Sequence, residues 1–222
     1  MAVEAVIWDF GGVFTSSPFE AFNRFEADNA LPKDLIRQIN SANPHENAWA
    51  LFERNEIDAA RFDQLFLAES TTLGHPVPGS AVLPLLSGTL RPQMVSALRV
   101  CKAYFKVGCI TNNVVSMHSP GQDEGQRAAG AMAQVMPLFD AIIESSKAGV
   151  RKPDPRIYLM MCDLLAVEPG NCIYLDDLGI NCKPAAALGM TAIKVVNVDQ
   201  TLAELAMTTG LTFAAEEPHE PA

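Results

Sequence analysis

The sequence has no apolar run long enough to cross a membrane: its longest apolar stretches fall well short of the roughly 18 residues that a transmembrane helix needs. The first ten residues carry an acid at Glu4 and no basic flank, so they do not resemble a signal peptide. These absences predict a cytoplasmic protein that has no membrane as a partner.

Basic residues are also scarce. Sixteen Lys and Arg stand against 26 Asp and Glu, which gives a net charge of −10. Because nucleic acids and anionic membranes bind to extended basic faces, neither is expected as a partner. A single small anion is still possible as a ligand, because a local basic site can lie on an acidic protein. A cluster of basic residues is, however, often only a solvated loop. Four basic residues lie within ten positions: Lys147, Arg151, Lys152 and Arg156.

The signatures of several enzyme classes are missing. The motifs G-x-S-x-G, G-x-x-x-x-G-K-[ST] and G-x-G-x-x-G do not occur, which argues against a serine hydrolase, a P-loop nucleotidase and a dinucleotide enzyme. The four histidines are scattered without metal-ligand spacing. The five cysteines are odd in number and form no C-x-x-C, which predicts free, buried thiols.

The composition is that of a globular protein, with 49% hydrophobic and 19% charged residues in a chain of 222. A chain of this length buries roughly 70% of its unfolded surface. Short apolar runs alternate with helical patterns, which predicts an α/β fold with a parallel sheet covered on both faces. Strands are expected at 3–8, 107–111, 141–144, 172–175 and 191–196, and helices at 94–105, 128–138, 155–166, 180–188 and 201–208.

A long helical stretch separates the first strand from the second. Ser17 begins a capping box with Pro18 at the first helical position, and the pattern stays helical to about residue 72, with breaks near Pro32 and Pro44. Residues 74–91 are rich in Gly and Pro, so they are expected to form a connector. The predicted organisation is an α/β core of residues 1–15 and 91–213, an inserted helical cap with its connector at 16–90, and a flexible tail at 214–222.

Polar residues stand where the predicted strands end, which is where parallel sheets bind ligands. Asp9 follows the first strand, and the N–H groups of Gly11 and Gly12 after it can face a phosphate. Thr111 and Asn112 end the second core strand, where a hydroxyl and an amide can hydrogen-bond an oxyanion. Each of these residues is also ordinary turn or cap chemistry.

The carboxyl half adds charged residues of both signs. Lys152 lies between Arg151 and Pro153, and the restricted backbone fixes where its ammonium emerges. Asp176 and Asp177 follow a strand, and two adjacent carboxylates repel each other unless a cation is present. Paired oxygens at a strand end suit Mg²⁺. A doubly capped turn is the alternative.

The order of these residues resembles the four-motif set of the haloacid dehalogenase-like hydrolases. The resemblance spans residues 3 to about 210, and residues 152–158 and 174–190 are similar to the subgroup that contains the amino-terminal phosphatase domain of soluble epoxide hydrolase. The motif residues are Asp9 and Gly12, then Thr111 and Asn112, then Lys152, then Asp176, Asp177 and Asn181.

The resemblance implies a Rossmann-like core with an inserted cap, and a small phosphorylated substrate. It implies Mg²⁺ held by Asp9, the Gly11 carbonyl and Asp177, with Asp176 and Asn181 in support. It also implies Asp9 as nucleophile, assisted in catalysis by Thr111 and Lys152. The residues that it places around the phosphoryl group are Gly12, Thr111, Asn112 and Lys152. For the oligomeric state, a homodimer is one possibility.

One position departs from the family. Its phosphatases usually carry a second Asp two residues after the nucleophile, whereas this chain has Gly11, which cannot move a proton. Positioned acid–base catalysis is typically worth about 10²–10⁴-fold. A phosphatase with this glycine would be slow, would use a substitute such as Thr15 or a cap residue, or would favour a good leaving group.

The departure leaves two other functions open. One is a phosphate-binding module with weak or no activity. The other is a 2-haloacid dehalogenase, because those enzymes also lack the second Asp, but they work without metal and have little use for Asp176 and Asp177. The sequence does not predict the substrate. Phe14, Phe19 and Phe22 have two interpretations, lining of an entry to the site or core packing, and core packing is the favoured one.

Overall fold

The computed structural model describes residues 2–86, 88–112 and 133–213. The loop predicted at 114–126, the first part of the helix predicted at 128–138 and the tail predicted at 214–222 lie outside the described residues. Residues 133–138 are helical and end in the short 3-10 helix η3 (Met136–Leu138).

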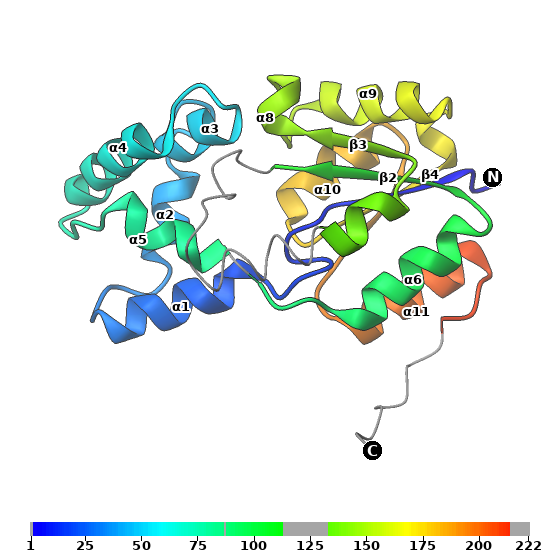
Figure 1. The fold of residues 1–222 in the computed structure, drawn as a ribbon, viewed down its shortest axis with the longest axis horizontal. Coiled ribbons are helices and arrows are strands. Elements are labelled where there is room, and N and C mark those ends of the chain that lie inside the picture. The colour runs from blue at the N-terminus through cyan, green and yellow to red at the C-terminus, as the bar shows by residue number, and fades with distance from the viewer. Residues whose placement is uncertain (1, 87, 113–132, 214–222) are drawn as a thin grey trace, which may run out of the picture.

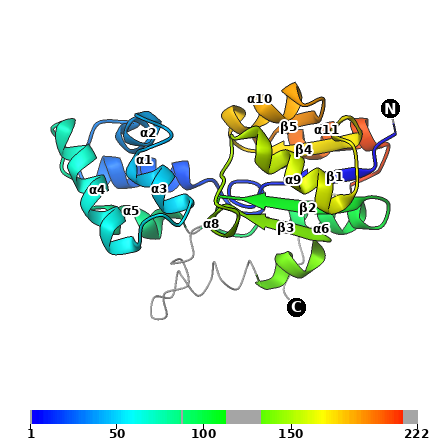
Figure 2. The ribbon, with the colours of Figure 1, turned by 90° about the horizontal axis from the view of Figure 1, so that it is seen from above.

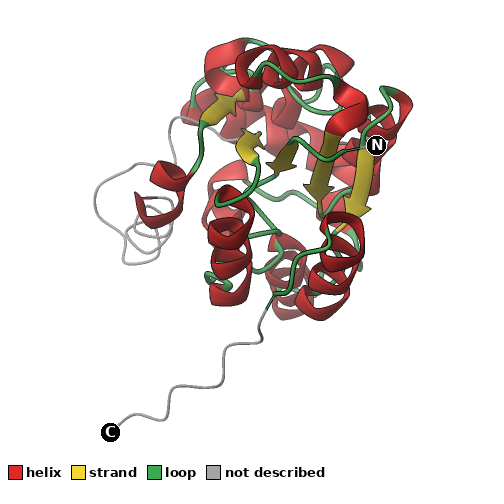
Figure 3. Ribbon diagram, turned by 90° about the vertical axis from the view of Figure 1, so that its right-hand side faces the viewer, coloured by secondary structure: helices red, strands yellow, loops and turns green. Residues whose placement is uncertain are grey.

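A five-stranded parallel sheet lies at the centre of the described core, in the order β3-β2-β1-β4-β5. β1 is the middle strand, and its Trp8 pairs with Cys109 on one side and Leu175 on the other. All of β1 is buried, because helices cover both faces of the sheet (Figures 1 and 3). The strands are β1 (Ala5–Trp8), β2 (Lys106–Thr111), β3 (Ala141–Glu144), β4 (Cys172–Asp176) and β5 (Thr191–Lys194).

Alternate residues of β1 feed two hydrophobic cores, one on each face of the sheet. Trp8 packs with α6 (Pro92–Lys102) and α11 (Val198–Thr209), and Ile7 packs with α9 (Pro155–Leu165) and α10 (Gly179–Ala187). Figure 1 shows α9 above the sheet and α6 with α11 below it. The predicted α/β fold with a Rossmann-like parallel sheet is confirmed. Two short helices complete the core, α8 (Ser145–Ala148) and η4 (Pro169–Asn171).

A second group of helices lies beyond the carboxyl ends of the strands (Figures 1 and 2). Its interior is an aromatic cluster centred on Phe62, whose ring centroid lies 4.7 Å from that of Phe52 and 5.5 Å from that of Phe66. The division of the chain at residues 15, 90 and 213 stays a prediction. The helices of this group, called the cap below, are α1 (Pro18–Asp28), α2 (Leu35–Ser41), α3 (Ala48–Glu53), α4 (Ala59–Thr72), α5 (Gly79–Val82) and η1 (Leu83–Leu86).

Two antiparallel linkers join the cap to the core. Thr15 forms an isolated bridge with Leu90, the N–H of Ser16 donates to the Thr89 carbonyl at 2.8 Å, and the N–H of Arg91 donates to the Phe14 carbonyl at 2.7 Å. The linkers lie so close that a Cβ on Gly88 would come within 2.6 Å of the Ser16 carbonyl oxygen. The paired linkers therefore fix where the cap begins.

Two local predictions were wrong. Residues 74–91 are not only a connector, because α5 and η1 form there; Gly79 lets α5 start against Phe62, since a Cβ would lie 2.7 Å from the ring. Ser17 does stand before α1, but its hydroxyl makes no capping bond. It donates instead to the Asp177 Oδ2 atom at 3.4 Å, so the capping box does not form.

Strand and helix limits also shifted by a few residues. α11 begins at Val198 rather than 201, because the Asn197 side chain caps it by accepting from the Gln200 N–H at 2.9 Å. Strand β5 ends at Lys194 rather than 196, and β4 extends to include Asp176. The capping side chain of Asn197 thus explains why α11 starts earlier than predicted. The predicted strands and helices of the core occur in the predicted order.

Most expectations about buried residues are confirmed. Phe14 lies in the core and Phe22 in the cap cluster, while Phe19 packs at the edge of that cluster beneath the Arg37 guanidinium. Core packing, not an entry, is therefore their role. All five cysteines are free and buried. Among the described residues, no helix is both long and apolar enough to cross a membrane.

Candidate active site

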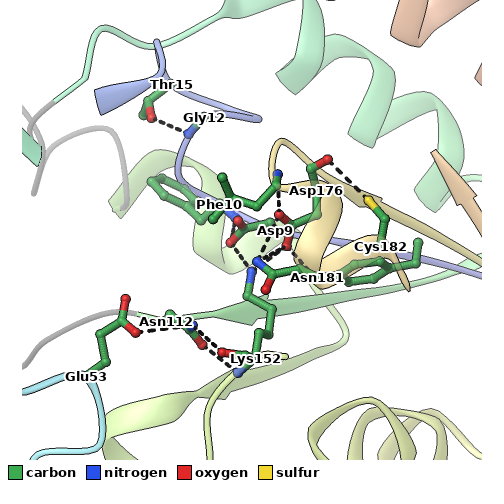
Figure 4. Close-up of polar contacts among 12 residues, drawn as sticks. Asp9, Phe10, Gly12, Thr15, Glu53, Asn112, Lys152, Asp176, Asn181 and Cys182 are labelled. Carbon is green, nitrogen blue, oxygen red and sulfur yellow. Dashed lines mark hydrogen bonds and ion pairs between the residues drawn. The ribbon is translucent and has the colours of Figure 1, made fainter. Parts of the chain in front are cut away.

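Three carboxylates meet at the carboxyl end of the two central strands. Asp9 follows β1 and Asp176 ends β4, and the N–H of Asp9 donates to the Leu175 carbonyl at 2.8 Å. Because neighbouring parallel strands end at the same edge, the sheet itself brings these side chains together. One oxygen of each of Asp9, Asp176 and Asp177 lies within 4.8 Å of the others. Figure 4 shows the first two converging on one point.

The Lys152 ammonium bridges two of these carboxylates. Its Nζ lies 2.7 Å from Asp9 Oδ1 and 2.8 Å from Asp176 Oδ2, and the residue is 1% exposed. Burial by itself would lower the pKa of Lys152, but Asp176 and Asp9 raise it, so the ammonium stays charged. Burial raises the pKa of Asp9 well above its usual value, against the opposing effect of Lys152. One buried cation thus faces an excess of negative charge.

Asp176 is the anchor of the cluster. Its oxygens accept from the Tyr174 hydroxyl at 2.5 Å, the Leu178 N–H at 2.8 Å and, at 3.1 Å each, from Asn181 Nδ2. Together with Lys152, these donors occupy both oxygens of a side chain that is fully buried. This arrangement fits a supporting role for Asp176 and Asn181 and leaves Asp9 and Asp177 to face a ligand.

Asp177 is only partly buried, and its side chain lies close to Gly12 in the loop after Asp9. Burial, followed by the charge of Asp176, raises the pKa of Asp177 to about 6. A Cβ on Gly12 would lie 2.1 Å from Asp177 Oδ2, and Gly12 has a φ of +71°, so this position requires glycine. Gly11 differs: its φ lies outside the left-handed region, and a Cβ there meets no atom within 4 Å. The backbone therefore does not explain the glycine at position 11.

The loop after Asp9 is held by side chains from both linkers. The Gly12 N–H donates to Thr15 Oγ1 at 3.3 Å, and Arg91 Nη1 donates to the Gly12 carbonyl at 2.8 Å. The Thr15 hydroxyl is thus engaged with the loop and buried, at 6% exposure. Arg91 was not predicted, because nothing in its local sequence signals a contact 79 residues away.

Thr111 and Asn112 lie at the end of β2, the strand beside β1. Thr111 is buried at 5% exposure. The Asn112 amide pairs with the backbone of Lys152: the Lys152 N–H donates to Asn112 Oδ1 at 3.0 Å, and Asn112 Nδ2 donates to the Lys152 carbonyl at 3.1 Å (Figure 4). The Asn112 side chain therefore holds the segment that carries Lys152, a use that differs from the predicted contact with phosphoryl oxygens.

The basic run of the sequence divides into two kinds of residue. Lys147 and Arg156 are exposed and pair locally with Glu144 and Asp154, as a solvated loop would. Lys152 is buried among the carboxylates, and Arg151 lies beside Glu53 of the cap. Asp154 caps α9 by accepting from the Arg156 N–H at 3.0 Å, which fixes the turn after Lys152.

Two further residues at the site were missed. Tyr174 lies two positions before Asp176 in the same strand, so the two share a face, and the alternation of strand side chains was the signal that could have found it. Glu53 reaches the site from the cap, with Oε2 at 3.4 Å from Asn112 Nδ2. Its sequence context, the end of a short helix, carries no such signal.

Comparison with known proteins agrees with this geometry. A family model described as haloacid dehalogenase-like hydrolase matches residues 3–189. Bifunctional epoxide hydrolase 2 of Sus scrofa is 30% identical over an alignment of 226 positions, which covers 95% of this chain and 40% of the relative. The sesquiterpene phosphatase astK of Aspergillus oryzae is 30% identical over 213 residues, which are 93% of this chain and 97% of the relative.

This chain thus spans about 40% of the length of the epoxide hydrolase. Among solved structures, the HAD-hydrolase YfnB of Bacillus subtilis bound to magnesium has a TM-score of 0.61 at 16% identity, and the match covers 95% of this chain and 100% of that one. At that identity, the likeness shows the shared fold. The match to the family model over most of the chain decides the family: this protein belongs to the haloacid dehalogenase-like hydrolases.

Proposed function

We propose that this protein is a Mg²⁺-dependent phosphatase that acts on a small phosphorylated substrate through Asp9. The observation that carries the proposal is the buried Lys152 ammonium, which lies 2.7 Å from Asp9 and 2.8 Å from Asp176. A carboxylate attacks a phosphate only if cations offset the repulsion between the two anions. A fixed lysine beside the proposed nucleophile supplies part of that charge.

The donor set suits Mg²⁺. Asp9 and Asp177 offer hard carboxylate oxygens, and the oxygens of Asp176 are already engaged. The family resemblance adds the Gly11 carbonyl as a further oxygen ligand. Burial is the main cause that raises the pKa of Asp9 and of Asp177, and a divalent cation held between these carboxylates would favour their ionised forms. When bound, the ion would offset the charge of the phosphate and keep Asp9 ionised.

The reaction then follows from the residues. An Asp9 oxygen attacks phosphorus, and the bond from phosphorus to the substrate oxygen breaks. The substrate oxygen leaves with the bonding electron pair as an alkoxide or phenolate, which takes a proton from water. Lys152 and the Thr111 hydroxyl bind the phosphoryl oxygens as charge builds up on them. Water next cleaves the aspartyl-phosphate and releases inorganic phosphate, which restores the Asp9 carboxylate. Because Gly11 supplies no proton, substrates with good leaving groups are favoured.

Gly11 also supports a second candidate, a phosphate-binding module with little or no turnover. Among the described residues, no atom lies within 4 Å of a Cβ built at Gly11, so no neighbouring side chain occupies the place of the missing acid. Such a module would bind phosphate through Lys152 and the loop after Asp9 without breaking the ester. A 2-haloacid dehalogenase would instead release chloride from its substrate without Mg²⁺.

The test is turnover of an aryl phosphate such as p-nitrophenyl phosphate, with and without Mg²⁺. We expect Mg²⁺-dependent hydrolysis that is lost in Asp9→Asn, because a neutral amide of similar volume is not a nucleophile. The matched control is Asp163→Asn, the same change at an exposed position of α9. Activity of Asp9→Asn above roughly a tenth of wild type would rule out the covalent mechanism, and a wild type that binds phosphate but never hydrolyses an ester would favour the module.

A further inference from the structure

Glu53 is a cap residue that reaches into the core. It ends α3 and is 8% exposed. Its Oε2 lies 2.7 Å from Arg151 Nε and 3.4 Å from Asn112 Nδ2, and its Oε1 accepts from Trp49 Nε1 at 3.0 Å. Its backbone carbonyl accepts from Ser145 Oγ at 2.6 Å. One residue of the cap thus contacts three residues of the core.

Those core residues lead directly to the candidate active site. Arg151 precedes Lys152 in the chain, and the Asn112 amide makes two hydrogen bonds to the Lys152 backbone. The Lys152 ammonium in turn contacts Asp9. Figure 4 shows Glu53, Asn112 and Lys152 in this order. A continuous set of polar contacts therefore joins α3 of the cap to the proposed nucleophile.

The contact between cap and core at this place is polar rather than tightly packed. An open hollow of about 500 Å³ lies between Pro44, His45 and Arg54 of the cap and core residues that include Arg151. Arg151 also donates from Nη1 to the Pro44 carbonyl at 3.1 Å. The ion pair of Glu53 and Arg151 and the hydrogen bonds of these two residues therefore join the cap to the core next to this hollow.

We propose that Glu53 is a positioning residue that links docking of the cap to the placement of Lys152. With the cap docked, Glu53 holds Arg151 and the Asn112 amide, and that amide fixes the Lys152 backbone. When the cap lifts away, Asn112 and Arg151 lose this partner, and Lys152 is less well placed against Asp9. The proposal rests on the proposed function, because Lys152 is taken to act on the phosphoryl group. Substrates that let the cap dock are then turned over faster.

Stability alone does not test this role, because removing one partner of a buried ion pair destabilises most proteins. The informative quantity is the division of the effect between kcat and KM. A residue that positions Lys152 for the transition state affects kcat, whereas a residue that binds the substrate equally in both states affects KM. A residue that only stabilises the fold lowers Tm and leaves both constants of the folded enzyme unchanged.

The kinetic experiment compares Glu53→Gln, Arg151→Gln and the double variant on p-nitrophenyl phosphate with Mg²⁺. We expect each single variant to lower kcat by about tenfold with KM changed by less than about threefold. The double variant should be about as slow as either single variant, because both remove the same link. The two singles change opposite sides of the contact, so if one fails to fold the other gives the same test.

The matched control is Glu26→Gln. Glu26 is also a buried cap carboxylate, at 2% exposure, but within the described part of the chain its carboxylate accepts from the Asp34 and Ile36 N–H groups of the cap alone, at 2.8 Å each. It should lower Tm and leave kcat within about twofold of wild type. Wild-type kcat in Glu53→Gln, or a loss confined to KM, would overturn the positioning role.

A second readout does not depend on turnover. The sequence has two tryptophans, and Trp8 is fully buried, so iodide quenching of fluorescence reports mainly on half-buried Trp49 beside Glu53. Arg151→Gln should raise this quenching because the cap detaches. If the wild type hydrolyses no phosphate ester, the proposed function fails; a rise in quenching then still supports the link, and unchanged quenching overturns it. An active wild type with unchanged kcat in Glu53→Gln overturns the link alone.

Discussion

The carboxylate edge of the sheet, formed by Asp9, Asp176 and Asp177, and the interior of the cap are both largely buried, but different interactions stabilise them. At the edge, Asp9, Lys152 and Asp176 are charged side chains that compensate one another. In the cap, the aromatic rings around Phe62 fill space, and the buried carboxylate Glu26 is satisfied by backbone N–H groups. A change of charge at this edge should therefore change the activity of the protein, whereas a change of side-chain volume in the cap should change its stability. The predictions below separate these two cases.

The largest effect is expected for Lys152→Ala. The substitution leaves Asp9 and Asp176 facing each other without their shared cation, and the loss of the Lys152 charge raises the pKa of Asp9 further. We expect kcat/KM to fall by at least about 10²-fold, because a fixed cation acts mostly on the charge of the transition state. Breaking a buried pair should also cost about 3–5 kcal/mol of stability. Kinetics on an aryl phosphate and denaturant unfolding measure the two losses.

The comparison variant is Lys152→Arg, which keeps the charge. Its planar guanidinium does not reproduce a point charge between two carboxylates, so it should restore stability better than activity. Full activity in Lys152→Arg would mean that only net charge matters at this position, and that the placement of the ammonium does not.

Phe62→Ala tests the opposite case. The ring of Phe62 contacts Phe52, Phe66 and Trp49, and it is fully buried. Its removal should cost about 3–5 kcal/mol of stability, because a cavity is left in the cap. Turnover per folded molecule should stay within about threefold of wild type, since no charge changes. A loss of kcat as large as that of Lys152→Ala would show that packing of the cap sets the chemistry as well.

The carboxylate edge was far easier to predict from the sequence than its contacts with the cap. Asp9 and Asp176 each end an apolar run, and parallel strands align their ends, so local pattern and fold class together place them side by side. Lys152 was identifiable by its prolines and by the order of motifs. All of this information lies in short segments whose arrangement the fold fixes.

The contacts of Glu53 and Ser17 had no such signal. Glu53 contacts Arg151, 98 positions further along the chain, and Ser17 contacts Asp177, 160 positions further. The local sequence around Glu53 carried no signal, and the local sequence around Ser17 predicted a helix cap. Ser17 was predicted to cap a helix because Ser-Pro-x-Glu is typical of helix starts. In the structure its hydroxyl donates to the carboxylate of Asp177 instead. Tertiary partners override local propensity wherever a buried group needs a donor, and only the folded chain shows which partner does so.

A smaller effect is expected at Gly12. Gly12→Ala places a Cβ where Asp177 now lies and asks alanine to adopt a φ of +71°. The backbone cost is about 1–2 kcal/mol, and displacement of Asp177 should weaken the activation by Mg²⁺. The neighbouring Gly11→Ala is the control, because its Cβ meets nothing within 4 Å. Equal Mg²⁺ titrations and equal Tm for the two variants would contradict the contact between Gly12 and Asp177.

The smallest effect, and the one that addresses the missing acid, is expected for Gly11→Asp. The ordinary φ and the open space at position 11 admit a side chain without strain, so the variant should fold. A carboxyl group there can protonate a leaving alcohol, which matters most when that alcohol is a poor leaving group. We therefore expect the ratio of alkyl to aryl phosphate turnover to rise by about tenfold or less, because the geometry around the new side chain is not optimised.

The control for this prediction is Gly11→Asn, which has the same shape but no acidic proton. If the ratio rises in the Asp variant and not in the Asn variant, proton transfer limits the natural enzyme on alkyl phosphates. If both variants behave alike while Tm is unchanged, bulk at position 11 is the cause. If neither changes the ratio, another group already supplies the proton. Thr15 is the first to test, because its hydroxyl lies on the same loop, 3.3 Å from the Gly12 nitrogen.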